Sequence, residues 1–187
     1  MKLYRILYYF MFLSAPVWAQ DKTAFKVIAA GVEAQAYPAG FILGVRADGS
    51  VSKNFSLNLR AGYNFARRGD LGEHMKERGG GPGLSAGARY YLKPGFMGFF
   101  LGARIEFWLM DIDWEDRLPN DDIRSGNTDI TVFQPLVEGG YTFGLGNGNW
   151  AITPKITLGY EINIKTKGEE VGQGAISLLG ATFTKRI

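Results

Sequence analysis

The chain contains no cysteine and only one histidine, and these two shortages narrow the chemistry open to it. Without cysteine there is no disulfide framework, no cysteine-linked lipid anchor and no thiolate nucleophile. With His74 alone, any histidine general base would have to be this one imidazole. The sequence therefore predicts no cofactor, no metal centre and no catalytic residue, and burial with backbone hydrogen bonding must stabilise the fold.

A hydrophobic run long enough for a transmembrane helix, about 20 residues, is also missing. The apolar run at 6–17 is shorter, follows two cations and leads to a small-residue pattern ending at Ala19. This pattern is typical of a secretory signal peptide. The alternative, an uncleaved anchor, is disfavoured because Pro16 would break its helix. We expect a signal peptide over 1–19 and a mature chain that starts at Gln20, which mass spectrometry of membrane-extracted protein can check.

An excess of either charge is absent from the mature chain, where 19 Lys and Arg face 18 Asp and Glu in 168 residues. No basic tract interleaved with aromatics is present, so nucleic-acid binding is not predicted. Glycine is plentiful, with 26 residues, and aromatics make up 14% of the chain. Because glycine is costly in helices, this composition argues against a helical bundle. The length fits one domain.

Alternation of apolar and polar residues is the dominant positive signal. It is strict over 55–65, 99–110 and 150–165, and none of the three apolar faces carries a charge. Such a period of two indicates strands with one apolar face. Weaker alternation marks further strands around 25–36, 41–48, 84–92, 129–143 and 175–187. The resulting even count of eight suits a closed antiparallel barrel.

The connections between these strands predict how the barrel is oriented. They fall near 37–40, 49–54, 66–83, 93–98, 111–128, 144–149 and 166–174. The second, fourth and sixth are tight turns, whereas the third and fifth are long and charged. Short periplasmic turns and long extracellular loops are typical of bacterial outer-membrane barrels. We predict an all-β fold over 20–187, a closed antiparallel eight-stranded transmembrane β-barrel with up-and-down meander topology.

The polar faces of the strands favour lipid outside the barrel. They consist mainly of Gly, Ser, Asn and Thr with isolated charges, which fits a narrow, crowded lumen. A soluble lipocalin-like barrel that binds a small apolar ligand, the alternative, would turn its apolar face inward. Buried charges persist only when paired, so we predict a lumen charge network. Its members are Glu33, Arg46, Arg60, Arg89, Arg104, Glu106, Glu138, Lys155 and Glu161. An eight-stranded lumen just accommodates its own side chains, so it should exclude solutes of metabolite size.

Aromatic residues gather near the two ends of the predicted strands. Aromatic belts at membrane–water interfaces are typical of membrane proteins. The group at the proposed periplasmic ends is Phe25, Phe55, Phe99, Tyr141, Phe143, Trp150 and Phe183. The group at the outer ends is Tyr63, Phe65 and Phe107.

Three segments carry a family resemblance: Arg89-Tyr90-Tyr91-Leu92-Lys93-Pro94, Gly98-Phe99-Phe100-Leu101-Gly102 and Leu179-Gly180-Ala181-Thr182-Phe183. They resemble the porin-family outer-membrane β-barrel domain common in Bacteroidetes-type bacteria. The resemblance covers essentially the whole mature chain and consists of loose hairpin patterns. It implies location in the cell outer membrane, among its lipid and lipopolysaccharide, and insertion by the barrel-assembly machinery. It implies no single activity, because the family is functionally mixed.

The chain departs from this family in two ways. The family's last strand usually ends in an aromatic residue, whereas the last aromatic here is Phe183, ahead of Lys185-Arg186-Ile187. Pro135 and Pro154 lie inside predicted strands, where each removes a hydrogen-bond donor from the ladder. We therefore predict a bulge at each proline.

An outer-membrane lipid-modifying hydrolase is the enzymatic alternative. His74 would have to serve as base, and the nearest serine in sequence is Ser85 on the next predicted strand. Glu106 and Glu138 could in principle exchange protons, but pairing with arginines accounts for both. We predict that His74 is solvated in a loop and that the protein is a non-enzymatic structural or surface-interaction barrel.

Two further segments fall in the predicted long loops. The carboxylates of Asp111–Asp116, continued by Asp121 and Asp122, alternate as calcium ligands do, but the glycine turn and terminal glutamate of a calcium loop are absent. We predict a solvated loop that meets lipopolysaccharide through shared divalent cations. The glycine run at 79–83 follows no phosphate-binding pattern and is predicted to be a flexible loop end.

Overall fold

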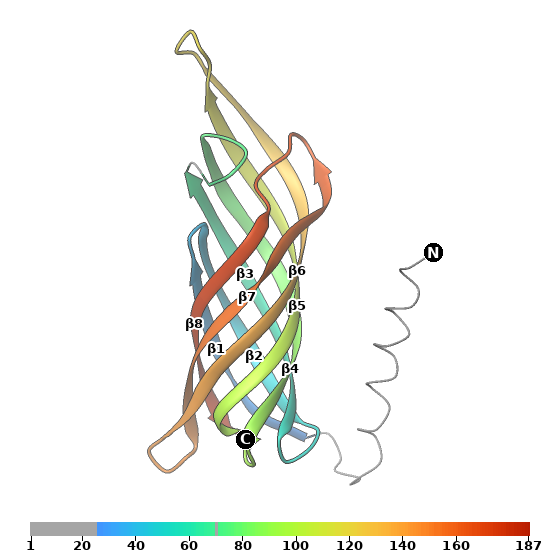
Figure 1. Cartoon of the computed structure of the whole chain (residues 1–187), viewed down its shortest axis with the longest axis vertical. Coiled ribbons are helices and arrows are strands. Elements are labelled where there is room, and N and C mark those ends of the chain that lie inside the picture. The colour runs from blue at the N-terminus through green and yellow to red at the C-terminus, as the bar shows by residue number, and fades with distance from the viewer. Residues whose placement is uncertain (1–25, 70) are drawn as a thin grey trace, which may run out of the picture.

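The computed structural model describes residues 26–69 and 71–187, which form eight strands and no helix. The strands are β1 (Lys26–Tyr37), β2 (Gly40–Ser50), β3 (Phe55–Gly69), β4 (Lys76–Lys93), β5 (Met97–Arg117), β6 (Ile123–Leu145), β7 (Trp150–Lys167) and β8 (Gly174–Arg186). Each pairs antiparallel with the next, and β1 pairs with β8, so the sheet closes into a barrel (Figure 1). The predicted fold class is confirmed. The predicted signal peptide, the start at Gln20 and Phe25 lie outside the described residues.

Within the described ranges, no helix is long and apolar enough to span a membrane.

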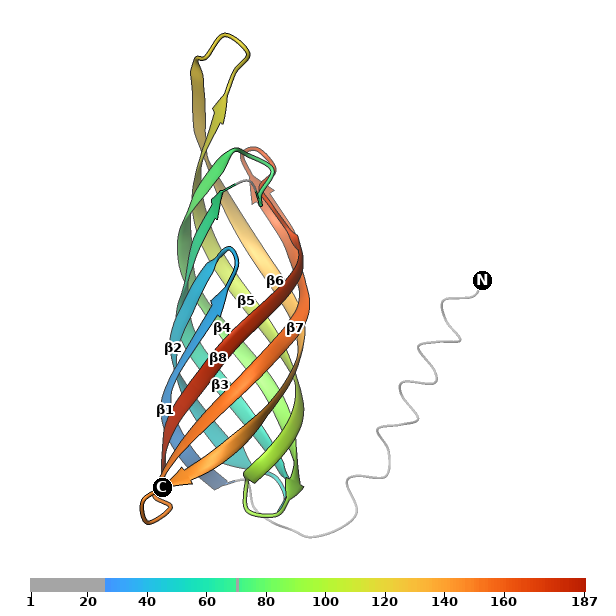
Figure 2. The ribbon, with the colours of Figure 1, turned by 60° about the vertical axis from the view of Figure 1, so that its left-hand side comes forward.

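The two ends of the barrel differ in height. The turns at 51–54, 94–96 and 146–149 lie at one end together with the C-terminus, and we call this the turn end (Figure 1). At the opposite end the hairpin of β5 and β6 projects farthest, whereas the hairpin of β1 and β2 is low (Figure 2). We call this the tall end. The three tight turns thus share one end, as the sequence predicts.

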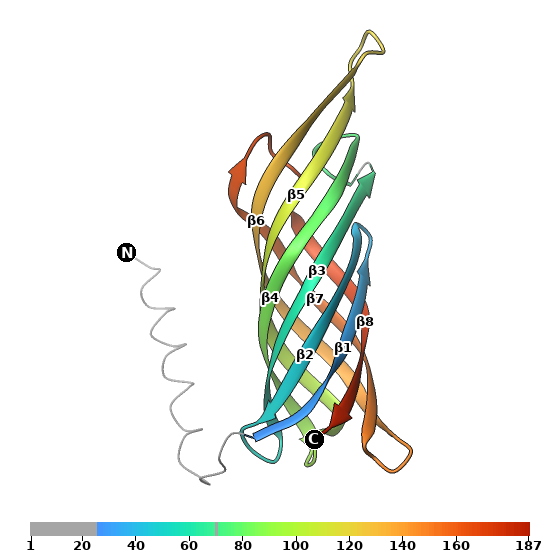
Figure 3. The same ribbon diagram turned by 180° about the vertical axis from the view of Figure 1, so that it is seen from behind.

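The predicted long loops at 66–83 and 111–128 are wrong. β3 continues to Gly69, β4 begins at Lys76, and β5 and β6 pair from Gly98↔Thr142 to Arg117↔Ile123. These extensions keep the alternation of the strands that they continue, because Ile112 and Trp114 are buried inside the barrel while the acidic residues that alternate with them, Asp111, Asp113 and Glu115, face outward. What the charge density suggested to be loop is therefore strand with a polar outer face. Figure 3 shows the ribbon of these extended strands from behind.

The glycine run at 79–83 is likewise part of β4 and not a loop end. Its residues pair with both β3 and β5. A Cβ at Gly81 would lie 1.6 Å from the Leu109 carbonyl oxygen, and one at Gly83 would lie 2.2 Å from the Trp108 ring. Glycine is needed here because the strands approach closely and the buried indole of Trp108 occupies the space of a side chain.

Alternation places the two kinds of residue on opposite faces of the wall. On the outside, Leu59, Ile105 and Leu158 are 66%, 45% and 51% exposed, whereas Arg60 and Arg104 are each 2% exposed inside. The outer face over 150–164 of β7 carries no charged residue. This is the inverse of a soluble barrel, whose apolar face would be enclosed.

Aromatic side chains pair across strands on the outer surface. Near the turn end Trp150 stacks on Phe183 with ring centroids 4.9 Å apart, and Phe99 meets Tyr141 at 4.7 Å. Toward the tall end Phe41 stacks on Phe65 at 4.5 Å. The predicted aromatic groups therefore lie at two levels of the barrel, on the same face as the apolar residues between them.

The bulges predicted at Pro135 and Pro154 are wrong. Between β6 and β7 the register is the same on both sides of each proline, and the ladder pairs that are missing are those of the prolines and one pair next to each. The irregularity lies instead between Thr131 and Val132. A proline lacks one donor but does not add a residue, so a pair can be lost without a register shift.

Candidate functional site: the barrel interior

All nine residues of the predicted lumen network lie inside the barrel, each at most 4% exposed. They come from seven strands, because the inward positions of neighbouring strands meet at the same level. Eight of the nine form one group together with Asp48, and Glu161 lies apart from it. This group, here called the central charge cluster, contains Glu33, Arg46, Asp48, Arg60, Arg89, Arg104, Glu106, Glu138 and Lys155.

Glu33 on β1 is the hub of the central charge cluster. Its carboxylate lies 2.5 Å from Arg46 Nη1 and from Arg60 Nη1, 2.6 Å from Arg104 Nη1 and 3.2 Å from Lys155 Nζ. The Thr182 hydroxyl also donates to it. Four cations from four strands therefore converge on one buried carboxylate.

Glu138 on β6 is the second shared acceptor. Arg89 Nε donates to it at 2.6 Å, and Lys155 Nζ donates to its other oxygen at 2.8 Å, with Arg104 Nη2 3.3 Å away. Glu106 takes the remaining contacts. Arg60 Nη2 lies 2.7 Å from Glu106 Oε2 in poor hydrogen-bond geometry, so this contact is mainly electrostatic. Each member is thus paired, as buried charges require.

Asp48 is a member that the sequence analysis missed. Its two oxygens accept from Arg46 Nε at 3.0 Å and Arg46 Nη2 at 2.5 Å, a bidentate pair. Asp48 has the inward parity of Arg46, so alternation on β2 could have revealed it. With Asp48 included, the cluster holds five cations and four anions.

Glu161 does not belong to the central charge cluster. Together with Arg68 and Glu77 it forms the upper charge cluster, nearer the tall end. Arg68 pairs with Glu161, and its Nη1 donates to Glu77 at 2.9 Å. Arg68 and Glu77 lie in the segment predicted to be a loop, which is why their inward parity went unnoticed.

The level between the two clusters is occupied mainly by apolar side chains, together with the amide side chain of Gln134. Trp108 is fully buried, and its indole N–H donates to Gln134, whose amide nitrogen donates in turn to Glu161 at 2.7 Å. Ile42 and Leu178 pack in the same buried apolar group. The interior is therefore layered, with charges at two levels and a mainly apolar layer separating them.

Two connections at the tall end, residues 71–75 and 168–173, have side chains buried against the barrel interior and are here called the tall-end cap. Glu77 Oε1 accepts from the backbone N–H groups of Glu73 at 2.8 Å and Gly172 at 3.1 Å. Val171 is 2% exposed and joins the buried apolar group. One buried carboxylate thus ties both connections to the barrel.

His74 is a buried member of the cap, which contradicts the prediction of a solvated loop histidine. Its ring stacks on Trp114 with centroids 4.2 Å apart. Nδ1 lies 2.7 Å from Asp116 Oδ2, and Nε2 lies 2.9 Å from the Glu170 carbonyl oxygen. Both partners are oxygen acceptors, and neither contact joins His74 to a serine. The structure thus does not bring together the base and the nucleophile of the hydrolase alternative, since Ser85 lies on the inner barrel wall with no hydrogen-bond partner in the described part of the chain.

Acid should loosen the contact between the cap and β5 at Asp116. Hydrogen bonds from His74 and from the Met75 N–H hold the pKa of this carboxyl below its usual value of about 3.9. Because the folded-state pKa is the lower one, the stabilisation is full above about pH 4 and is lost as pH falls through the lowered value. In denaturant titrations from pH 6 down to pH 2, the denaturant concentration at half-unfolding should fall less steeply with pH in Asp116→Asn than in the unmodified protein.

Asp129→Asn is the matched control for this prediction. Asp129 faces outward at the tall end, and its side chain makes no hydrogen bond within the described residues. If the two variants and the unmodified protein showed parallel pH profiles, the Asp116 contact would contribute no acid-sensitive stability.

The acidic segment at 111–116 is divided by strand parity. Asp111 and Asp113 face outward, and both accept from the Asn127 side chain, at 2.6 and 2.9 Å. Asp116 instead contacts His74 Nδ1. No cluster of three or more potential metal-ligating His, Asp or Glu side chains occurs among residues 26–69 and 71–187. The segment is thus a strand, and the predicted solvated loop is wrong.

No protein-family model matches the sequence. No curated protein matches it either. Neisserial surface protein A is similar in structure, with a TM-score of 0.48 and 13% identity over 87% of this chain and 97% of that chain. So is outer membrane protein AlkL, determined in lipid bilayers, with a TM-score of 0.47 and 14% identity over 91% and 96%. The N-terminal β-barrel domain of Pseudomonas aeruginosa OprF gives 0.41 and 13% over 84% and 96%.

Proposed function

We propose that this protein is an outer-membrane β-barrel that acts without catalysis, as a structural or surface-interaction protein, through its tall end. The observation that carries the proposal is the combination of a charge-free apolar outer belt with a charge-filled interior. Such a wall is stable when its outside meets hydrocarbon, because every backbone group of a closed barrel is paired within the sheet. The turn end would then face the periplasm and the tall end the exterior.

The belt and the strand lengths support this location. Spanning takes about 9–11 tilted residues, and the strands have 11 to 23. The excess lies at the tall end, above the aromatic level of Phe41 and Phe65. Assignment to the porin-family domain remains a prediction from the sequence patterns.

Membrane placement can be tested by flotation. The purified protein, reconstituted into phospholipid vesicles, should float with lipid after alkaline carbonate extraction and should require detergent to remain in solution without vesicles. A protein that stayed monomeric in buffer without detergent would overturn the proposal and favour the lipocalin-like alternative.

The surface above the belt supports contact with lipopolysaccharide. A shallow hollow on the outer face, beside Tyr63, is lined by Lys165 and Lys167 on β7, Asp129 on β6 and Asp111 on β5. Lysines at this height can meet lipid phosphates, and carboxylates can share divalent cations with them. This hollow replaces the predicted acidic loop as the proposed place of contact.

We expect the barrel to conduct no steady current. Paired charges, Phe100 and Trp108 are buried in the interior, and an eight-stranded barrel is just wide enough for its own side chains, so we expect solutes of metabolite size to find no continuous path. Planar-bilayer recordings of the unmodified protein should show no large, well-resolved conductance steps. Steady openings would refute the closed lumen and move a porin role ahead.

The proposal that the barrel acts without catalysis can be tested separately. Release of fatty acid from phospholipid or lipid A by the reconstituted protein should equal that of empty vesicles. Release that disappears in His74→Ala, with folding unchanged, would revive the hydrolase alternative.

A further inference from the structure

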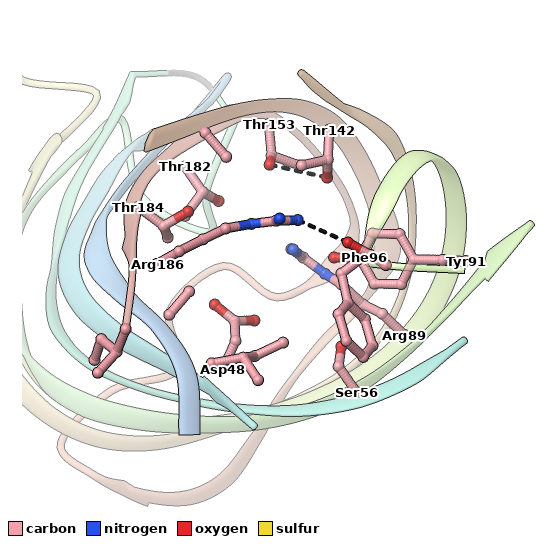
Figure 4. A pocket seen from close by; sticks show the side chains of 15 residues that line it. Asp48, Ser56, Arg89, Tyr91, Phe96, Thr142, Thr153, Thr182, Thr184 and Arg186 are labelled. Carbon is pink, nitrogen blue, oxygen red and sulfur yellow. Dashed lines mark hydrogen bonds between the residues drawn. The ribbon is translucent and has the colours of Figure 1, made fainter. Parts of the chain in front are cut away.

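The turn end of the barrel contains a cavity of about 280 Å³. Its inner wall is formed by Asp48, Ser56, Arg89 and Thr182, and its rim includes Phe96 and Arg186. Figure 4 shows Arg89 and Arg186 extending into it from different sides of the ring, from β4 and β8. The cavity lies directly below the central charge cluster, because Arg89 belongs to both.

Two buried donors of this wall have no hydrogen-bond partner in the described part of the chain. They are Arg89 Nη2 and Ser56 Oγ, on residues 2% and 1% exposed. Arg89 is held in place by its Nε bond to Glu138 and by the Phe100 ring, 4.3 Å below its guanidinium carbon. A fixed guanidinium with an unused N–H group beside a hydroxyl favours the binding of a hydrogen-bond acceptor, because a buried donor without a partner costs folding free energy.

The charges around the cavity favour the binding of an anion. The central charge cluster has one cation more than it has anions, and Arg186 adds another at the rim, where its Nη2 donates to the Gly95 carbonyl oxygen at 2.7 Å. Asp48 is already counted among these anions, and both of its oxygens accept from Arg46. Buried uncompensated charge is unfavourable, so a bound monoanion would complete the pairing.

The rim selects an organic anion over a mineral one. Phe96 packs edge-on against Tyr91 with ring centroids 5.5 Å apart, and Ile28 and Ile187 add aliphatic surface. Phe96 adopts a positive φ of 61°, a conformation that is strained for a phenylalanine. The turn at 94–96 thus holds an aromatic ring at the mouth at some conformational cost, as is seen where a segment serves binding.

We propose that this cavity binds a small carboxylate, with its oxygens on Arg89 Nη2 and Ser56 Oγ and its apolar part against Phe96 and Tyr91. Arg186 would close the mouth behind it. A free organic acid and the terminal carboxylate of a short peptide share this chemistry. That the site opens to the periplasm rests on the proposed function, but binding in a detergent micelle does not depend on it.

The test is a titration of the isotope-labelled full-length protein in micelles with acetate, N-acetyl-alanine, inorganic phosphate and sodium chloride, at constant ionic strength. Backbone amide shifts of Ser56, Gly95 and Thr184 report the cavity. We expect saturable shifts with N-acetyl-alanine, weaker binding of acetate because it lacks the apolar part, and no saturation with chloride. Tighter binding of phosphate than of N-acetyl-alanine would overturn the assignment to a carboxylate.

Two pairs of variants locate the site. Ser56→Ala and Arg186→Gln should each weaken N-acetyl-alanine binding by about tenfold, the effect of one hydrogen bond to a charged group. Ser85→Ala, which removes another buried and unpartnered hydroxyl elsewhere in the lumen, and Arg117→Gln at the tall end should leave it unchanged. Lack of saturation in the unmodified protein, or equal affinities in all four variants, would refute the site. Floating vesicles with no carboxylate binding would refute this inference while leaving the proposed function intact.

Discussion

Replacing Glu33 by glutamine is expected to lower the free energy of unfolding by about 3–5 kcal/mol. The substitution keeps the size of the side chain and removes the charge on which Arg46, Arg60, Arg104 and Lys155 converge. All five side chains are at most 1% exposed, so water cannot replace the lost partner. Denaturant titration in lipid vesicles, followed by tryptophan fluorescence, measures the change.

The charge count predicts an asymmetry between anions and cations of the cluster. Glu33→Gln leaves five cations against three anions, whereas Lys155→Met leaves four against four. Since replacing part of a buried ion network by an apolar residue is often neutral when the remaining charges stay paired, Lys155→Met should cost far less. It should also restore part of the stability lost in Glu33→Gln, because the excess of cations returns to one.

Glu115→Gln is the matched control. Glu115 pairs with Lys76 at 3.4 Å at the tall end, where the two side chains are 47% and 66% exposed, so its loss should cost about 0–1 kcal/mol. Equal costs for Glu33→Gln and Glu115→Gln would show that the central charge cluster contributes no more than a surface pair. If Glu33→Gln does not fold at all, the double variant with Lys155→Met still decides whether charge balance is the reason.

The barrel and its faces could be predicted because alternation requires no knowledge of partners. In a strand, parity alone assigns Arg60 and Arg104 to one face and Leu59 and Ile105 to the other. Eight strands and three tight turns then leave little choice of topology. The nine predicted lumen charges followed from the same rule, and all lie inside.

The predictions that were wrong concern features that depend on contacts between residues far apart in the sequence. Charge and glycine content made 66–83 and 111–128 look like loops, but their inward residues have partners outside their own strand. Glu77 contacts Arg68 and Gly172, and Trp114 contacts His74 and Thr128. His74 is buried because Asp116, 42 residues away, and Glu170, 96 residues away, meet its two ring nitrogens. The separation of Glu161 from the central charge cluster likewise depends on the heights of strands relative to one another, which no local pattern specifies.

Replacing Leu158 by arginine is expected to destabilise the barrel by about 2–4 kcal/mol in a bilayer. Leu158 lies near the middle of the apolar outer face of β7, is 51% exposed and pairs with Val137, itself 61% exposed. No anion on the neighbouring outward positions could receive the guanidinium, and both water-facing ends of the barrel are several residues away. The new charge would therefore have to remain in hydrocarbon or distort the lipid around it.

Ile123→Arg makes the same chemical change on the outer side of β6 at the tall end, beyond the aromatic level, where Ile123 is 65% exposed. If lipid surrounds the belt and water surrounds the tall end, this variant should lose at most about 1 kcal/mol, the value near an interface. In detergent-free buffer containing urea the two variants should behave alike, because the unfolded chain offers both sites to water. The difference should therefore arise only on folding into vesicles. Equal stability of Leu158→Arg and Ile123→Arg in bilayers would mean that the apolar face of β7 does not meet lipid, and the transmembrane arrangement would have to be abandoned.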